Sequence, residues 1–170
     1  MSLSMYQASI PVFVRALNVL SALLDKAESH AADKGVDLST LVNARLAPDM
    51  YPLSGQIQRA SDTAKFAIKR LAGVDAPSFE DKETTFADLR KRIADTIAWL
   101  QSVPASALEG SEGRTVQLSF GEHKPSFQGD AYLLTFALPN FFFHVTTAYG
   151  ILRHSGVPVG KLDYLGSYPA

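Results

Sequence analysis

Apolar residues recur at helical spacing in four stretches of the chain. In the first stretch, residues 4–32, they are separated by alternating steps of four and three, which places them on one stripe of a helix. The stripe comprises Tyr6, Ile10, Phe13, Leu17, Leu20, Leu24 and Ala27. Pro11 lies in the first turns, where a missing amide costs least, and residues 33–35 end the segment with a glycine. The spacing predicts a long amphipathic helix.

Two shorter helices are predicted next. Pro52 begins one over residues 52–71, and Gly73 stops it. Its apolar stripe contains small residues that let a neighbouring helix approach closely, namely Ala60, Ala64 and Ala67. A T-x-x-D capping pattern near Thr85 begins the other helix, which stops before Pro104. Each of the two segments thus has its own start and stop signals.

The pattern changes between residues 111 and 128, where apolar and polar residues alternate around a GEHKP interruption. A short strand or hairpin is predicted there. Residues 130–138 include YLLTFAL, which suits either a buried strand or a helical turn. Pro139 fits the first turn of a fourth helix, which runs to His154 and closes with Gly156 in a left-handed cap. The predicted fold is all-α, a four-helix bundle with a short β-hairpin or extended insertion before the last helix.

Length and composition add bounds on domain organisation. The chain has 170 residues, of which 46% are hydrophobic, and this is enough to fill one core. We expect a single domain over residues 4–170. Residues 1–3 are a candidate expression leader, because a second methionine follows at Met5.

Charge and missing residue types exclude several classes of function. The chain has 16 lysines and arginines against 17 acidic residues, a net charge of −1, so no global field attracts nucleic acid or anionic lipid. Without cysteine, thiol chemistry and disulfides are excluded, which fits a reducing compartment. No apolar run approaches the roughly 20 residues of a membrane span, and no signal-peptide pattern begins the chain. We therefore expect a cytoplasmic protein that binds neither nucleic acid nor membrane.

His144 is the candidate site residue of the last helix. Helical geometry places it with Asn140 on the flank of the buried face, and it places Gln56 on the flank of the second helix's apolar stripe. Gln56 and His144 can therefore meet inside the bundle. One interpretation makes His144 a metal ligand or general base beside Asn140 and Gln56. The other makes it a core histidine whose hydrogen bonds are satisfied by Gln56 or a backbone carbonyl.

Other candidate residues form weaker groups. Asp49, Asp62 and Lys65 lie near or on the second helix and can form an acid and base set, although exposed helix charges are the usual explanation of such residues. Tyr149, in the last helix, is a further pocket candidate. No nucleophile elbow, phosphate-binding loop, dinucleotide fingerprint or H-E-x-x-H motif occurs in the chain.

Three segments carry a resemblance to a known family. PDMYPLSGQIQRASDTAK, PNFFFHVTTAYGILRHSGV and GKLDYLG resemble the signatures of domain of unknown function family 1993, and the similarity extends over nearly the whole chain. That family belongs with the DinB-like, or YfiT-like, superfamily of four-helix bundles. Its better understood members bind a divalent metal through three histidines, one from the second helix and two from an H-x-x-x-H on the last. By this resemblance the three ligand positions fall on Gln56, Asn140 and His144.

The resemblance implies a degenerate form of that metal pocket. The cofactor that the resemblance implies is a divalent metal, nickel or zinc. One imidazole and two neutral amides, however, lack the charge and softness of zinc sites. We therefore expect no tightly bound zinc. The superfamily includes thiol-dependent transferases. Two functions therefore stay open, one enzymatic and one not. The protein is either a divergent metal-dependent hydrolase or transferase, or a noncatalytic bundle that binds a small molecule or a protein partner.

A homodimer formed through helix faces is also expected. Val12, Val19 and Leu23 lie outside the main stripe of the first helix. Phe66 lies away from the alanine-lined face of the second helix, and residues 141–143 place rings all around the last one. One bundle buries one stripe per helix, so these positions need a second cover, either the hairpin region or a partner subunit. Related DinB-like proteins often pair through their bundles, so the resemblance favours the partner subunit.

Overall fold

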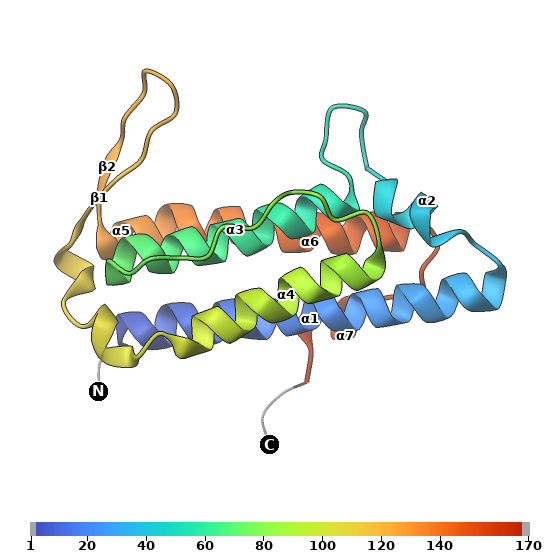
Figure 1. The fold of residues 1–170 in the computed structure, drawn as a ribbon, viewed down its shortest axis with the longest axis horizontal. Coiled ribbons are helices and arrows are strands. Elements are labelled where there is room, and N and C mark those ends of the chain that lie inside the picture. The colour runs from blue at the N-terminus through green and yellow to red at the C-terminus, as the bar shows by residue number, and fades with distance from the viewer. Residues whose placement is uncertain (1–2, 168–170) are drawn as a thin grey trace.

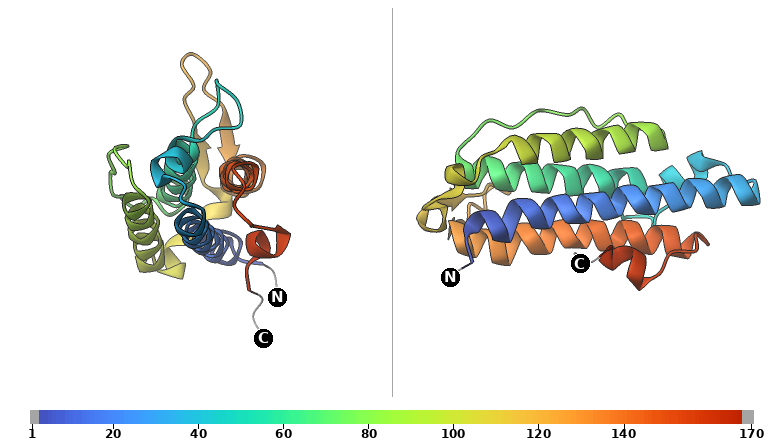
Figure 2. Two further views of the ribbon diagram at one scale, coloured as in Figure 1. Left: turned by 90° about the vertical axis from the view of Figure 1, so that its right-hand side faces the viewer. Right: turned by 90° about the horizontal axis from the view of Figure 1, so that it is seen from below.

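Four long helices form the body of the structure. The computed structural model describes residues 3–167, so the first two residues of the candidate leader lie outside the described part. The helices are α1 (Met5–Lys34), α3 (Leu53–Ala72), α4 (Phe86–Ser102) and α6 (Leu138–His154), and they lie side by side (Figure 1 and Figure 2). The prediction of an all-α bundle with a short hairpin before the last helix is confirmed.

The chain direction explains why residues 73–85 run along the length of the bundle (Figure 1). α1 and α6 run one way along the bundle and α3 and α4 run the other way (Figure 1). α3 packs between α4 and α6 and presents Ala60, Ala64 and Ala67, all fully buried, as predicted. Because α3 and α4 are parallel, residues 73–85 return along the bundle surface before α4 begins (Figure 1). We call residues 73–85 the crossover.

The predicted start of α4 and the predicted stop of α3 are those of the structure. The hydroxyl of Thr85 caps α4 by accepting from the Asp88 amide at 3.1 Å, and the Asp88 carboxylate accepts from the Thr85 amide at 3.0 Å. Hydrogen bonds from Thr85 and Thr84 lower the pKa of Asp88. Gly73 ends α3 with a φ of 69°, a left-handed conformation that glycine adopts without strain.

The last helix begins earlier than predicted. α5 (Gly129–Tyr132), a π-helical segment η3 (Leu133–Ala137) and α6 follow one another without a break, so the ambiguous residues 130–138 are helical. Pro139 therefore lies inside a continuous helix and does not start one. Proline lacks an amide and crowds the carbonyl four residues before it, and the wider turn of η3 directly precedes it. The Leu138 amide accordingly bonds the carbonyl of Leu133, five residues back.

Two segments project from the same side of the bundle (Figure 1 and Figure 2). One is the antiparallel hairpin of β1 (Thr115–Gln117) and β2 (Ser126–Gln128), with Val116 opposite Phe127. The other is the loop between α2 (Leu38–Asn43) and α3. Further short elements that the sequence did not indicate are η1 (Ala105–Leu108), η2 (Ser111–Gly113) and α7 (Lys161–Leu165).

α7 covers part of α1 within the same chain. The guanidinium of Arg15 donates to the carbonyl of Leu165 at 2.6 Å, and the ammonium of Lys26 pairs with Asp163 at 2.6 Å. Val19 and Leu23 are both buried, so they need no second subunit to cover them. That part of the reasoning for a homodimer is wrong, because both side chains are covered within the chain.

α1 is the one helix of residues 3–167 that is long and apolar enough to cross a membrane. Half of its most apolar stretch is buried inside the bundle, where α1 packs against α4 and α6 among others. The apolar residues of α1 form a stripe on one face of the helix, so they make no unbroken apolar run in the sequence.

Candidate functional site

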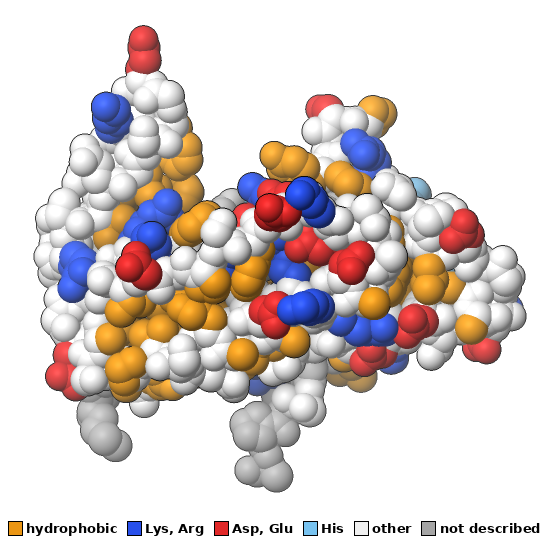
Figure 3. All heavy atoms as spheres, in the orientation of Figure 1, with side chains coloured by type: hydrophobic (Ala, Val, Ile, Leu, Met, Phe, Trp, Pro, Cys, Tyr) orange, Lys and Arg blue, Asp and Glu red, His pale blue; other side chains and the backbone are white. Residues whose placement is uncertain are grey.

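A groove of about 220 Å³ lies between α3, α6 and the hairpin. Its lining includes Phe66 and Arg70 of α3, Phe120 of the hairpin, Phe136 of η3, and Asn140 and His144 of α6. In the space-filling view the surface is hollowed between the two projecting segments (Figure 3). The groove thus combines aromatic walls with polar groups from two facing helices, which is the usual make-up of a ligand site in a bundle.

The ring of His144 is oriented by Gln56. Nδ1 of His144 lies 2.8 Å from Oε1 of Gln56, and both side chains are buried. Nε2 of Gln56 donates to the carbonyl of Tyr51 at 3.1 Å, so the oxygen of this amide must face the ring. Nδ1 of His144 is therefore the protonated nitrogen. The predicted contact between Gln56 and His144 is confirmed, and it fixes one tautomer.

Nε2, the other ring nitrogen of His144, has no protein partner in the described residues and can bond a ligand in the groove. Nε2 of His144 makes no hydrogen bond within residues 3–167, and the residue lines the groove. Burial lowers the pKa of His144 from 6.5 to about 4, and the charge of Arg59 adds to this effect. The ring is therefore neutral at neutral pH and presents a lone pair on Nε2 as a hydrogen-bond acceptor.

Asn140 presents a second acceptor. Its Nδ2 donates to the hydroxyl of Thr63 at 2.9 Å, and that hydroxyl donates to the carbonyl of Arg59 at 2.7 Å. The hydroxyl proton is thus committed, so Asn140 must use its nitrogen there and keeps Oδ1 for other partners. Asn140 and His144 are four residues apart on one helix and line the same groove, but their side chains do not bond each other.

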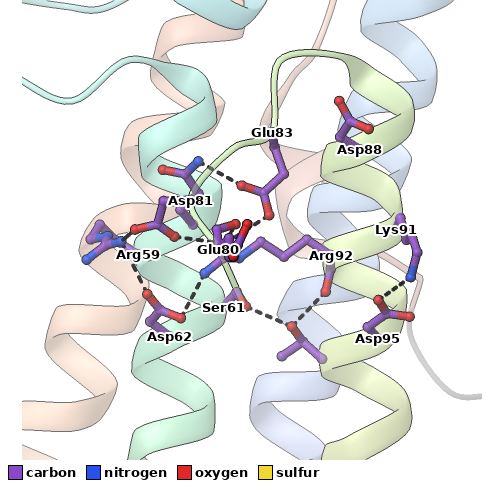
Figure 4. Close-up of polar contacts among 12 residues, drawn as sticks. Arg59, Ser61, Asp62, Glu80, Asp81, Glu83, Asp88, Lys91, Arg92 and Asp95 are labelled. Atoms are coloured by element: carbon purple, nitrogen blue, oxygen red, sulfur yellow. Dashed lines mark hydrogen bonds and ion pairs between the residues drawn. The ribbon is translucent and has the colours of Figure 1, made fainter. Parts of the chain in front are cut away.

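Beside the groove lies a buried ion network centred on Arg92 of α4 (Figure 4). Its guanidinium pairs with Asp62 of α3 at 2.8 Å and with Asp81 and Glu83 of the crossover, each at 2.9 Å. The side chain of Arg92 is 1% exposed. Charges so far from water are tolerated only when paired, so this network fastens the crossover to α3 and α4.

Lys65 belongs to the same network. Its ammonium pairs with Asp62 at 3.1 Å, donates to the carbonyl of Pro77 at 3.1 Å and lies 3.8 Å from the ring centre of Phe79. Burial lowers the pKa of Lys65, and Asp62 opposes this effect. The expectation that Asp62 and Lys65 are exposed helix charges is therefore wrong. The crossover covers them, and the two side chains are committed to each other and to Arg92.

Two further candidate residues lie away from the groove. Asp49 is exposed in the loop before α3. Tyr149 packs its ring edge to face against Tyr164 of α7, with ring centres 5.7 Å apart. Neither side chain is among those that line the groove. The structure thus brings His144 and Asn140 to the groove, with Gln56 bonded to His144 from α3. Asp62 also lines the groove, whereas Asp49 and Tyr149 lie outside it.

The sequence prediction missed the residues that complete the groove on α3. Arg59, Thr63, Phe66 and Arg70 all line it. Together with Gln56 they are spaced three, four, three and four residues apart, so they form a second helical stripe beside the alanine-lined one. This mixed polar and aromatic stripe is visible in the sequence. Spacing alone does not show that this stripe lines a groove, because the groove also depends on where α6 and the hairpin lie.

The donor atoms do not fit the three-histidine metal set. Both ends of the Gln56 amide bond protein partners, which leaves one imidazole nitrogen and one amide oxygen from α6. Within residues 3–167 no three histidine and acidic side chains are grouped so that they could hold a metal ion. Gln56 thus lies behind His144 as the group that orients it, which is the place of an outer hydrogen-bond partner.

The chain is similar to a known protein family and to a solved structure. The family model described as "Domain of unknown function (DUF1993)" matches residues 5–165. A crystal structure of a DinB family member protein from Shewanella denitrificans is 42% identical in sequence, covers 98% of this chain and 94% of that chain, and has a TM-score of 0.90. No curated protein matches the chain. The predicted resemblance and the DinB-like fold are confirmed.

Proposed function

The chain belongs to the DUF1993 family of unknown function, and we propose that it is a small-molecule-binding bundle. The ligand lies in the groove between α3 and α6 and donates a hydrogen bond to Nε2 of His144. The observation that carries the proposal is the Gln56 contact at 2.8 Å, which fixes the tautomer and leaves the lone pair on Nε2 of a residue that lines the groove.

The chemistry of the groove supports a ligand with hydrogen-bond donors. Nε2 of His144 and Oδ1 of Asn140 are both acceptors, and each is held by a partner on α3, Gln56 or Thr63. Such groups need no reordering when a ligand arrives, which lowers the cost of binding. An N–H or O–H group on the ligand complements them, because a buried acceptor that loses its water needs a donor.

Binding is favoured over catalysis by the state of the candidate groups. General bases work best with a pKa near the operating pH, whereas burial lowers the pKa of His144 to about 4. Lys65 and Asp62 are engaged in the ion network, so neither is available as its partner in proton transfer. A neutral, oriented imidazole with a weakly basic lone pair is suited to recognition.

Titration with a small neutral donor tests the proposal. The probe is 4-hydroxyphenylacetamide, which has one ring and donors at both ends, followed by the ¹⁵N signals of the histidine rings. We expect Nε2 of His144 to shift on titration and His144→Phe to weaken binding about tenfold, because one hydrogen bond is lost. The matched control is His154→Phe, since His154 is exposed in the last turn of the same helix. Equal binding to both variants contradicts the proposal.

A further inference from the structure

Arg70 gives the groove one positive charge that no carboxylate of the described residues pairs with. Its Nη1 donates to the hydroxyl of Tyr132 at 3.0 Å, and within residues 3–167 it forms no ion pair. Burial raises the pKa of Tyr132, so this hydroxyl stays protonated and leaves the charge in place. Arg59, the other arginine of the groove, pairs with Asp62 and Asp81.

The guanidinium of Arg70 is also held in position. Its central carbon lies 5.5 Å from the ring centre of Phe66 and 5.9 Å from that of Tyr132. With Nη1 bonded to Tyr132, the remaining N–H groups are still unused in the described part of the chain. We infer that the groove binds a small aromatic carboxylate, with the carboxylate on Arg70. This inference rests on the proposed function and names the ligand class of the same site.

The spacing of the polar groups sets the length of such a ligand. Arg70 lies opposite Tyr132, and Thr63 lies opposite Asn140, so the two pairs are seven residues apart along α3. At 1.5 Å per residue this is about 10 Å, the length of one ring with a short side chain. Phe66, Phe120 and Phe136 line the groove and offer apolar surface to a flat body.

Size and charge narrow the class further. The groove of about 220 Å³ is smaller than the roughly 300–1,000 Å³ of sites for drug-sized ligands, so a single ring fits the scale better. One arginine matches the planar fork and single charge of a carboxylate. A phosphate dianion would keep one charge unbalanced in this groove.

Three probes and two variants test the inference. The probes are 4-hydroxyphenylacetate, its neutral amide and phenyl phosphate, titrated by calorimetry or ligand-observed NMR at concentrations up to about 10 mM. We expect the wild-type protein to bind the carboxylate about tenfold more tightly than the amide. Arg70→Gln should remove this preference. Lys69→Gln should keep it, because Lys69 is the next residue on α3, carries the same charge and lies outside the groove lining.

The outcomes separate this inference from the proposed function. A preference for the carboxylate that survives Arg70→Gln, or no preference in the wild type, overturns the assignment to Arg70. Tighter binding of phenyl phosphate overturns the choice of carboxylate. If the amide binds and His144→Phe weakens it while Arg70→Gln changes nothing, the proposed function stands without the inference. If no probe depends on His144 but the Arg70 preference holds, the proposed function fails and the anion site remains.

Discussion

Gln56 and His144 meet across the interface of α3 and α6, with Oε1 of the amide 2.8 Å from Nδ1 of the ring. Both ends of the Gln56 amide are engaged, because its nitrogen donates to the carbonyl of Tyr51 and its oxygen faces the ring. The amide therefore orients the imidazole and leaves Nε2 of His144 without a protein partner in residues 3–167. The charge state of the ring can be tested directly.

Gln56→Glu should raise the pKa of His144. A carboxylate at this position would accept from Nδ1 and favour the imidazolium, by one unit or more above the wild-type value of about 4. An NMR titration of the ring measures this shift. The control is Gln101→Glu, which adds the same charge at an exposed position of α4 and should leave the ring unchanged. A ring that titrates alike in all three proteins would show that the contact is not formed in solution.

The buried neutral ring should make stability depend on pH. Burial lowers the pKa of His144 from 6.5 to about 4, so between these values the unfolded chain binds more protons than the folded one. Stability therefore rises with pH across this window and is lost as pH falls through it. We expect urea unfolding to show about 2 kcal/mol more loss from pH 7 to pH 4.5 in the wild type than in His144→Gln. The carboxylates titrate in both proteins, so an equal loss would argue against a buried neutral ring.

Arg92→Met should destabilise the fold strongly. Removing this guanidinium leaves the carboxylate of Glu83 without its ion-pair partner and takes from Asp62 one of its two buried cations, which costs about 3–5 kcal/mol. Arg90→Met is the control on the same helix, because Arg90 pairs with Asp25 and Glu28 at the surface and should cost less than about 1 kcal/mol. Urea unfolding measures both values. Similar losses in the two variants would mean that the crossover is not fastened by Arg92.

Gly129→Ala should disturb the start of the last helix. A Cβ at this position would lie 1.9 Å from the carbonyl oxygen of Ser111, a backbone atom that cannot turn away. We expect a loss of about 1–3 kcal/mol, as for other overpacked sites, measured by urea unfolding. Gly113→Ala is the matched control, since nothing lies within 4 Å of its added carbon. No difference between the two alanine variants would contradict the close packing of η2 on α5.

The homodimer stays a prediction, but fewer exposed apolar side chains now support it. Val19 and Leu23 are covered within the chain, whereas Phe66 is 41% and Phe143 is 55% exposed. Phe143 is the ring of residues 141–143 that leaves the core, as the sequence indicated. Light scattering at micromolar concentration should give twice the chain mass of 18.4 kDa. A measured mass equal to that of a single chain would contradict the prediction of a dimer.

Periodicity in the sequence was sufficient for the features that depend on one helix at a time. The apolar stripes of α1 and α3, the cap at Thr85 and the flank positions of Gln56 and His144 all follow from spacing and local chemistry. The contact of two flank positions could be predicted because neighbouring helices in a bundle turn their flanks toward each other.

Features that depend on distant segments could not be predicted in this way. Lys65 looks like a surface charge until the crossover residue Phe79 covers it, and no local pattern indicates that residues 73–85 fold back onto α3. α7 is five residues long, too short for a periodic signal. The second stripe on α3, which includes Arg59, Thr63, Phe66 and Arg70, is visible in the sequence. That it lines a groove depends on the facing helix α6, which spacing alone does not place.

The π-helical turn sets the rotational phase of the last helix. Tyr132 and His144 are twelve residues apart and both face the groove. In an unbroken α-helix twelve steps of about 100° would leave them about 120° apart around the axis. The wider turn at residues 133–137 absorbs about one residue, so the remaining eleven steps bring them to within about 20° of each other. One surplus residue thus aligns the arginine-bound tyrosine with the histidine, and its deletion would turn one end of the groove away from the other.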